Sequence, residues 1–175
     1  MPLASAALVL GLAGCGVFGS DRGQVDFTAP GLAEANRSTV VRSGPDNAYE
    51  EEIVRWRRSW TEPPTAHIIR RTLSPGHKFV QVPELRDFVS GFGKTANARF
   101  GAEYSDTALG RIDHRIFRLG EIDCLGFRGL TGGTFVIGYY CAPPGITMTQ
   151  EEARVLVHSL RLTRGPDSAG GKSNR

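Results

Sequence analysis

A hairpin that places two cysteines opposite each other is the feature that most constrains this fold. Two apolar segments, 122–130 and 134–141, are separated by a turn that contains Gly132-Gly133. A Gly-Gly pair suits a two-residue primed turn, because both central residues of that turn need positive φ. Centring the turn on this pair puts Cys124 directly opposite Cys141, in a non-hydrogen-bonded pair whose Cα atoms lie about 4.5 Å apart. A disulfide accepts that separation, so we predict a Cys124–Cys141 bridge.

The C-terminal part of the chain carries the clearest helix signal. Residues 149–152 read Thr-Gln-Glu-Glu, a capping box with Thr at the cap and Glu three residues later. Ala153, Leu156, Val157 and Leu160 follow at helical spacing. We predict a second helix over 83–92, with Pro83 in its first turn.

A third helix is predicted over 46–60. Asp46 suits the N-terminal cap, the acidic run 50–52 lies near the helix start, and Arg55, Arg57 and Arg58 lie near its end. This distribution of charge is the one that the helix dipole favours. Pro63-Pro64 then prevents any continuation.

The remaining apolar segments are predicted as strands. They lie at 25–28, 39–42, 98–104 and 114–119, and 67–73 is ambiguous between a strand and a short helix. This order, followed by the hairpin and the last helix, predicts an α+β fold: a mostly antiparallel sheet with the disulfide-stapled hairpin and the C-terminal helix packed on one face. The element order is similar to that of the extrinsic photosystem subunits, a resemblance that implies the same layering.

The N-terminus resembles that of bacterial lipoproteins. Residues 1–14 carry no charge and are too few to span a bilayer. They end in Leu12-Ala13-Gly14-Cys15, which matches the lipobox. The resemblance implies a signal peptide at 1–14, lipidation of Cys15, and anchoring on the periplasmic side of the cell envelope. Gly16 after the cysteine favours the outer membrane. The alternative is a buried N-terminal helix with an ordinary cysteine.

The rest of the chain then divides simply. We expect residues 15–24 to form a lipidated tether, 25–164 a single domain, and the polar, Gly-rich residues 165–175 a disordered tail. Cys124 and Cys141 are the two cysteines that remain, an even number that suits an oxidising compartment. The formal net charge of +3 is too small and too dispersed for a nucleic-acid binder.

No motif predicts a cofactor or a metal. Gly91-Phe-Gly-Lys-Thr95 resembles the end of a phosphate-binding loop, but Phe88 stands where that loop needs Gly, which favours a helix C-cap. The four histidines (His67, His77, His114, His158) show no zinc-helix spacing. Gly-x-Ser-x-Gly is absent, and Ser105 is interpreted as an ordinary loop residue. Asp113 and His114 are adjacent on a strand, so they point to opposite faces. His114 is nevertheless the first residue to test for catalysis.

Two groups of side chains have alternative interpretations. Arg55, Arg57 and Arg58, with Arg70 and Arg71 beyond, form either a solvated face, which we favour, or a basic surface for anionic lipid or a cell-wall polymer. The aromatic residues are interpreted as core rather than as a glycan or peptide site: Trp56, Trp60, Tyr139 and Tyr140.

The leading hypothesis for function is a non-enzymatic envelope lipoprotein. It would be held to the membrane by its lipid and act as a binding or scaffolding module for another envelope protein or a cell-wall polymer. The alternatives are an envelope hydrolase and an accessory subunit of a secretion or transport assembly.

Overall fold

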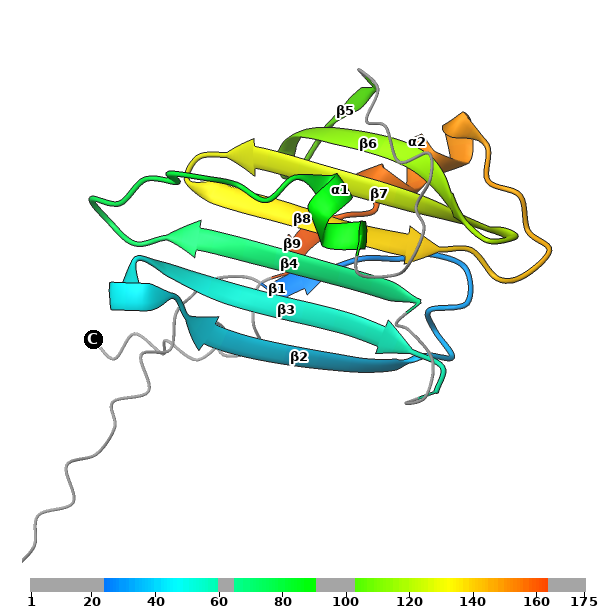
Figure 1. The fold of residues 1–175 in the computed structure, drawn as a ribbon, viewed down its shortest axis with the longest axis horizontal. Coiled ribbons are helices and arrows are strands. Elements are labelled where there is room, and N and C mark those ends of the chain that lie inside the picture. The colour runs from blue at the N-terminus through cyan, green and yellow to red at the C-terminus, as the bar shows by residue number, and fades with distance from the viewer. Residues whose placement is uncertain (1–23, 60–64, 91–102, 164–175) are drawn as a thin grey trace, which may run out of the picture.

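The computed structural model describes residues 24–59, 65–90 and 103–163. Within these residues, seven strands form one antiparallel sheet in the order β2-β3-β4-β8-β7-β6-β5 (Figure 1). The strands of this sheet are β2 (Asn36–Ser43), β3 (Tyr49–Arg57), β4 (Ala66–Leu73), β5 (Tyr104–Thr107), β6 (Gly110–Leu119), β7 (Ile122–Thr131) and β8 (Thr134–Cys141). Two short strands, β1 (Gln24–Asp26) and β9 (Arg161–Thr163), pair with each other. The helices are α1 (Leu85–Ser90), α2 (Gln150–His158) and the 3-10 turn η1 (Pro45–Asn47).

The large sheet consists of two meanders placed side by side. Strands β2 to β4 pair with their neighbours in sequence, as do β5 to β8. The meanders join where β4 pairs with β8. The predicted α+β fold, mostly antiparallel with a C-terminal helix on one face, is therefore confirmed.

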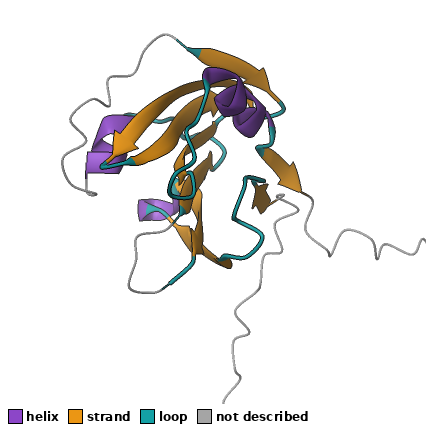
Figure 2. Ribbon diagram, turned by 90° about the vertical axis from the view of Figure 1, so that its right-hand side faces the viewer, coloured by secondary structure: helices purple, strands orange, loops and turns teal. Residues whose placement is uncertain are grey.

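Side chains on both faces of the sheet are buried. On β8, Val136 and Tyr140 belong to the core beneath α2, whereas Phe135, Ile137 and Tyr139 belong to the core beneath α1. This alternation follows from the two-residue period of a strand. Figure 2 shows the sheet edge-on, with helices on either side of it.

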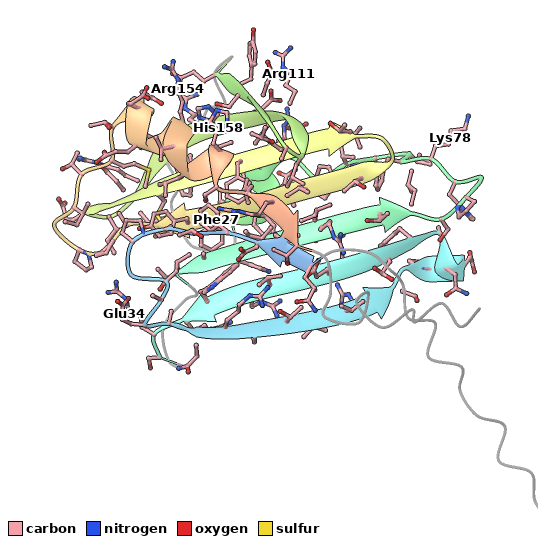
Figure 3. The ribbon with its side chains drawn as sticks, turned by 180° about the vertical axis from the view of Figure 1, so that it is seen from behind. Phe27, Glu34, Lys78, Arg111, Arg154 and His158 are labelled. Atoms are coloured by element: carbon pink, nitrogen blue, oxygen red, sulfur yellow. A yellow bond between two sulfur atoms is a disulfide. The ribbon has the colours of Figure 1, made fainter. Side chains whose placement is uncertain are left out.

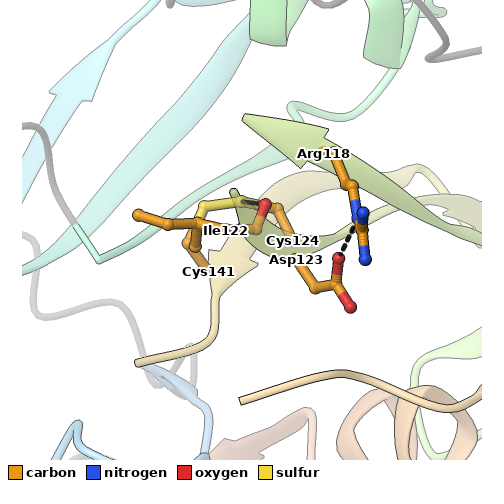
Figure 4. Close-up of a disulfide and its surroundings, with 5 residues drawn as sticks. All are labelled: Arg118, Ile122, Asp123, Cys124 and Cys141. Carbon is orange, nitrogen blue, oxygen red and sulfur yellow. Dashed lines mark hydrogen bonds and ion pairs between the residues drawn. A yellow bond between two sulfur atoms is a disulfide. The ribbon is translucent and has the colours of Figure 1, made fainter. Parts of the chain in front are cut away.

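The predicted hairpin is confirmed in turn and register. Gly132 and Gly133 take φ of 55° and 77°, and Cys124 pairs with Cys141. A disulfide joins the two cysteines, whose Cα atoms lie 4.0 Å apart (Figure 4). It lies on the α1 face of the sheet, where Cys124 belongs to the buried core.

The predicted helix over 46–60 is wrong, because residues 49–57 form strand β3. The acidic and basic residues of this segment had favoured a helix, but its glutamates form ion pairs with arginines on neighbouring strands instead. Glu51 accepts hydrogen bonds from Arg42 and Arg71 at 2.6 Å each. Ile53 and Val54 are β-branched residues that suit a strand, and both are buried.

The other predicted elements differ mainly at their ends. The ambiguous segment 67–73 is strand β4, and the helix predicted over 83–92 is α1, at Leu85–Ser90. Helix α2 ends at His158, and Leu162 already belongs to β9. The strand predicted at 98–104 lies mostly outside the described residues, and β5 begins at Tyr104.

Strand β1 is held against the large sheet by the buried Glu52 and by Arg37 on β2. The carboxylate of Glu52 accepts a hydrogen bond from the Val25 amide, with both oxygens at 3.2 Å, and forms an ion pair with Arg70 at 3.0 Å. Arg37 donates to the Val25 carbonyl at 2.9 Å. The segment after β1 then places Phe27 against the rings of Trp56, Phe127 and Tyr140. Figure 3 looks onto this face, with Phe27 labelled near its centre.

Candidate functional site

An apolar groove runs between helix α2 and the segment that follows β1. Its volume is about 700 Å³, within the range of about 300–1,000 Å³ that is typical of ligand pockets. The apolar residues that line it are Ala29, Pro30, Tyr140, Ala142, Ile146, Met148, Val155 and Leu156. The polar residues are Thr28, Thr147, Glu151, Glu152, Ser159 and Arg161. We call this feature the α2 groove.

Hydrogen bonds from both ends of α2 fix one wall of the groove. At the start, the predicted capping box is present: Thr149 Oγ1 accepts from the Glu152 amide at 3.2 Å, and Glu152 Oε2 accepts from the Thr149 amide at 2.7 Å. At the end, the hydroxyl of Ser159 donates to the Thr28 carbonyl at 2.8 Å and accepts from the Thr28 amide at 3.2 Å. Ser159 therefore ties the helix to the opposite wall.

Hydrogen bonds also fix the floor of the groove. Tyr140, which is buried, donates its hydroxyl to the Pro30 carbonyl at 2.9 Å. Asp123 accepts a hydrogen bond from the Met148 amide at 3.0 Å. It accepts another from Arg118 at 2.7 Å, which Figure 4 shows. The hydrogen bond from the Met148 amide is the largest cause that lowers the pKa of Asp123, and the hydrogen bond from Arg118 lowers it further. The groove is thus largely preformed.

Two large apolar side chains stand exposed at the mouth of the α2 groove. Ile146 is 56% exposed and Val155 is 62% exposed. Exposed apolar side chains that border an apolar groove are typical of a surface that binds a partner or a ligand.

The structure brings Ser105 and His114 together, which the sequence analysis missed. Ser105 Oγ lies 3.0 Å from His114 Nε2, and both residues are buried. Ser105 pairs with Ile112 in the β5–β6 hairpin, so His114 is its diagonal neighbour two residues along β6. Recognising that hairpin in the sequence would have predicted the contact.

The Ser105–His114 pair is closed off from solvent. Neither residue lines the α2 groove, and among the described residues His114 Nδ1 has no hydrogen-bond partner. Burial is the largest cause that lowers the pKa of His114, which favours the neutral imidazole. Asp113 lies on the other face, 3.7 Å from Arg128, so the predicted separation of Asp113 from His114 is confirmed.

A second, smaller groove lies on the α1 face. It has a volume of about 420 Å³ and is lined by residues that include Glu84, Arg111, Asp113 and Arg128. Arg128 forms ion pairs with both Glu84 and Asp113. The opposite charges are therefore balanced within the groove, which gives it no preference for an anion or a cation.

The arginines of the candidate basic surface are divided among different environments. Arg70 is buried and forms an ion pair with Glu52, whereas Arg71 forms an ion pair with Glu51 on the other face of the sheet. Arg55 and Arg57 alternate with Trp56 on β3, so both point to the face opposite that ring. Both contribute, after the larger effect of burial, to lowering the pKa of His67 to about 4. Arg58 is exposed just beyond the strand.

The aromatic residues take the core roles that were predicted for them, where they are described. Trp56, Tyr139 and Tyr140 are buried, and Tyr140 also forms part of the groove floor. Trp60 lies outside the described residues, as do Cys15 and the loop-like sequence 91–95.

Comparison of the chain with protein-family models, curated proteins and solved structures finds no match. In the described part of the chain, no group of three or more His, Cys, Asp or Glu side chains is placed to hold a metal. The described helices include none that is long and apolar enough to cross a membrane. The α2 groove is therefore the candidate site on the evidence of its own geometry.

Proposed function

We propose that this chain is a lipid-anchored protein of the cell envelope that binds an apolar ligand in the α2 groove. The observation that carries the proposal is the groove itself, which is open to solvent, apolar and about 700 Å³ in volume, and has the exposed Ile146 and Val155 at its mouth. Preformed apolar pockets with a few polar groups are the usual form of a binding site. The lipobox at Leu12–Cys15 supports the anchor, and the Cys124–Cys141 disulfide suits an oxidising compartment.

The anchor is tested by mass spectrometry of the N-terminal peptide from the membrane fraction. We expect the mature chain to begin at a lipid-modified Cys15, and a Cys15→Ala variant to lose both the modification and the membrane association. An unmodified chain that begins at Met1 would contradict this part of the proposal. It would leave the groove to be tested separately.

Binding in the groove is tested with anilinonaphthalenesulfonate, a dye that fluoresces in apolar sites. We expect the Cys15→Ala chain, purified without detergent, to bind the dye, and Val155→Asn to reduce the binding. Val41→Asn is the matched control, because Val41 is 59% exposed on β2 and does not line the groove. Equal loss in both variants, or no binding at all, would contradict a binding role for the groove.

An envelope hydrolase is the second candidate, and the hydrogen bond between Ser105 and His114 is the observation that favours it. A serine nucleophile needs a base, a group that orients the base, and access for the substrate. In the described residues His114 Nδ1 has no partner, and the pair lines neither groove. We therefore prefer the binding role.

A further inference from the structure

We propose that the ligand of the α2 groove is a single acyl chain of a membrane amphiphile. The inference rests on the proposed function and names the chemical class of its ligand. The acyl chain would lie along the apolar lining, and the headgroup would stay in solvent at the mouth, near the exposed Arg161.

Several of the polar groups along the groove already have partners, which favours an apolar ligand. The hydroxyl of Tyr140 is bonded to the Pro30 carbonyl, and Ser159 is bonded to both the amide and the carbonyl of Thr28. Glu152 is engaged in the capping box with Thr149. A polar ligand that entered the groove would lose hydrogen bonds to water that these groups cannot replace, which is costly. A hydrocarbon loses nothing of this kind.

The size of the groove also favours an acyl chain. A helix with its side chains is about 10–12 Å across, so a volume of about 700 Å³ would hold less than about two turns. An extended peptide would bring a backbone amide and carbonyl at every residue, each of which needs a partner. An acyl chain is thin and has no polar group along its length, so it satisfies both limits.

The groove also lies close in sequence to the proposed lipid anchor. Thr28 and Pro30 line the groove, and Thr28 follows Cys15 by thirteen residues. Whatever its path, that length of chain spans at most about 45 Å. A lipid on Cys15 would therefore hold the groove within reach of a bilayer, where amphiphiles with acyl chains are the abundant apolar ligands.

The test uses the full chain with Cys15→Ala, purified without detergent, and displacement of the bound dye by octanoate, decanoate and dodecanoate. We expect affinity to rise by up to about fourfold for each added methylene until the groove is filled. Val155→Asn and Ile146→Asn should each weaken decanoate binding about tenfold, which corresponds to about 1.4 kcal/mol. Val41→Asn should leave it unchanged.

The outcomes separate this inference from the proposed function. If the dye binds and Val155→Asn weakens it, but fatty acids fail to displace it, the groove binds ligands of another class and the acyl-chain proposal is overturned. If decanoate binds equally well to Val155→Asn and to the parent chain, the fatty acid occupies another site, and the proposal is again overturned. If the dye itself does not bind, the proposed function fails first.

Discussion

Ion pairs and hydrogen bonds of two buried glutamates connect the first four strands of the chain. Glu51 and Glu52 are adjacent on β3 and therefore point to opposite faces of the sheet, where each is 1% exposed. Burial tends to raise the pKa of Glu51, but the hydrogen bonds from Arg71 and Arg42 outweigh that effect and lower it. Glu52 joins Arg70 to the Val25 amide, so it couples β1 to the large sheet.

A Glu52→Gln variant should be destabilised by up to about 3–5 kcal/mol, because the buried Arg70 loses its nearer carboxylate at 3.0 Å and keeps only Glu50 at 4.0 Å. The amide oxygen of Gln can still accept the hydrogen bond from the Val25 amide, so the loss of stability measures mainly the ion pair. Urea unfolding followed by circular dichroism measures the change. Glu34→Gln removes the same charge at an exposed position and should change stability by less than about 0.5 kcal/mol. Similar values for the two variants would contradict a structural role for the pair.

At the scale of elements, α2 is a short helix that depends on its ends and on one packed face. Ala153 and Val157 are buried against the sheet, whereas Val155 and Leu156 line the groove. The capping box provides an acceptor for the Glu152 amide in the first turn, and Ser159 attaches the last turn to Thr28. The stability of this helix and the shape of the groove are therefore linked.

A Thr149→Ala variant should lose about 1 kcal/mol of stability, the usual effect of removing a helix cap. It removes the hydroxyl that accepts from the Glu152 amide. Thermal unfolding measures the loss, and Thr147→Ala, an exposed threonine just before the helix, is the control. If the two substitutions lower the melting temperature equally, the cap contributes nothing beyond loss of a surface threonine.

At the scale of the whole molecule, the central strands of the sheet are buried on both faces, whereas β2 at the edge is largely exposed, and each buried face contains a histidine. His67 lies against the rings of Phe88 and Tyr139 on the α1 face, and His114 lies on the α2 face. In the described residues, one ring nitrogen of each has no hydrogen-bond partner. Both cores therefore favour a neutral imidazole.

Stability should fall as the pH decreases below about 6.5. Burial, with smaller effects of Arg55 and Arg57, lowers the pKa of His67 from 6.5 to about 4. Between these values the unfolded chain binds a proton that the folded chain excludes, so acid favours unfolding. The pKa values of Glu51 and Asp123 are also lowered, so their contribution is lost as the pH falls further, below about 4.5.

Urea unfolding at several values between pH 7.5 and pH 4.5 tests the histidine contribution. His67→Phe keeps an aromatic ring against Phe88 but cannot bind a proton, so its stability should depend less on pH across this range. His77→Gln removes an exposed histidine and should keep the dependence of the parent chain. An unchanged slope in His67→Phe would assign the acid sensitivity to other groups.

Local chemistry by itself determined the hairpin, the disulfide and the start of α2. A Gly-Gly turn fixes the register of the strands that flank it, and that register places Cys124 against Cys141. The capping box of Thr149 and Glu152 likewise acts within four residues. The order of the predicted strands, the hairpin and the last helix also predicted the fold class, because the signal for each element lies within its own segment.

Only the tertiary structure decided the elements whose partners are distant in the chain. The charges of residues 49–57 are distributed as they would be in a helix. However, Glu51 and Glu52 form ion pairs with arginines on β2 and β4, and the segment is a strand. The α2 groove likewise combines Thr28–Pro30 with α2, more than a hundred residues away. The burial of these charges and the formation of the groove both depend on contacts between residues that are far apart in the sequence. Such contacts stabilise the chain only after it has folded, so they can override local propensity.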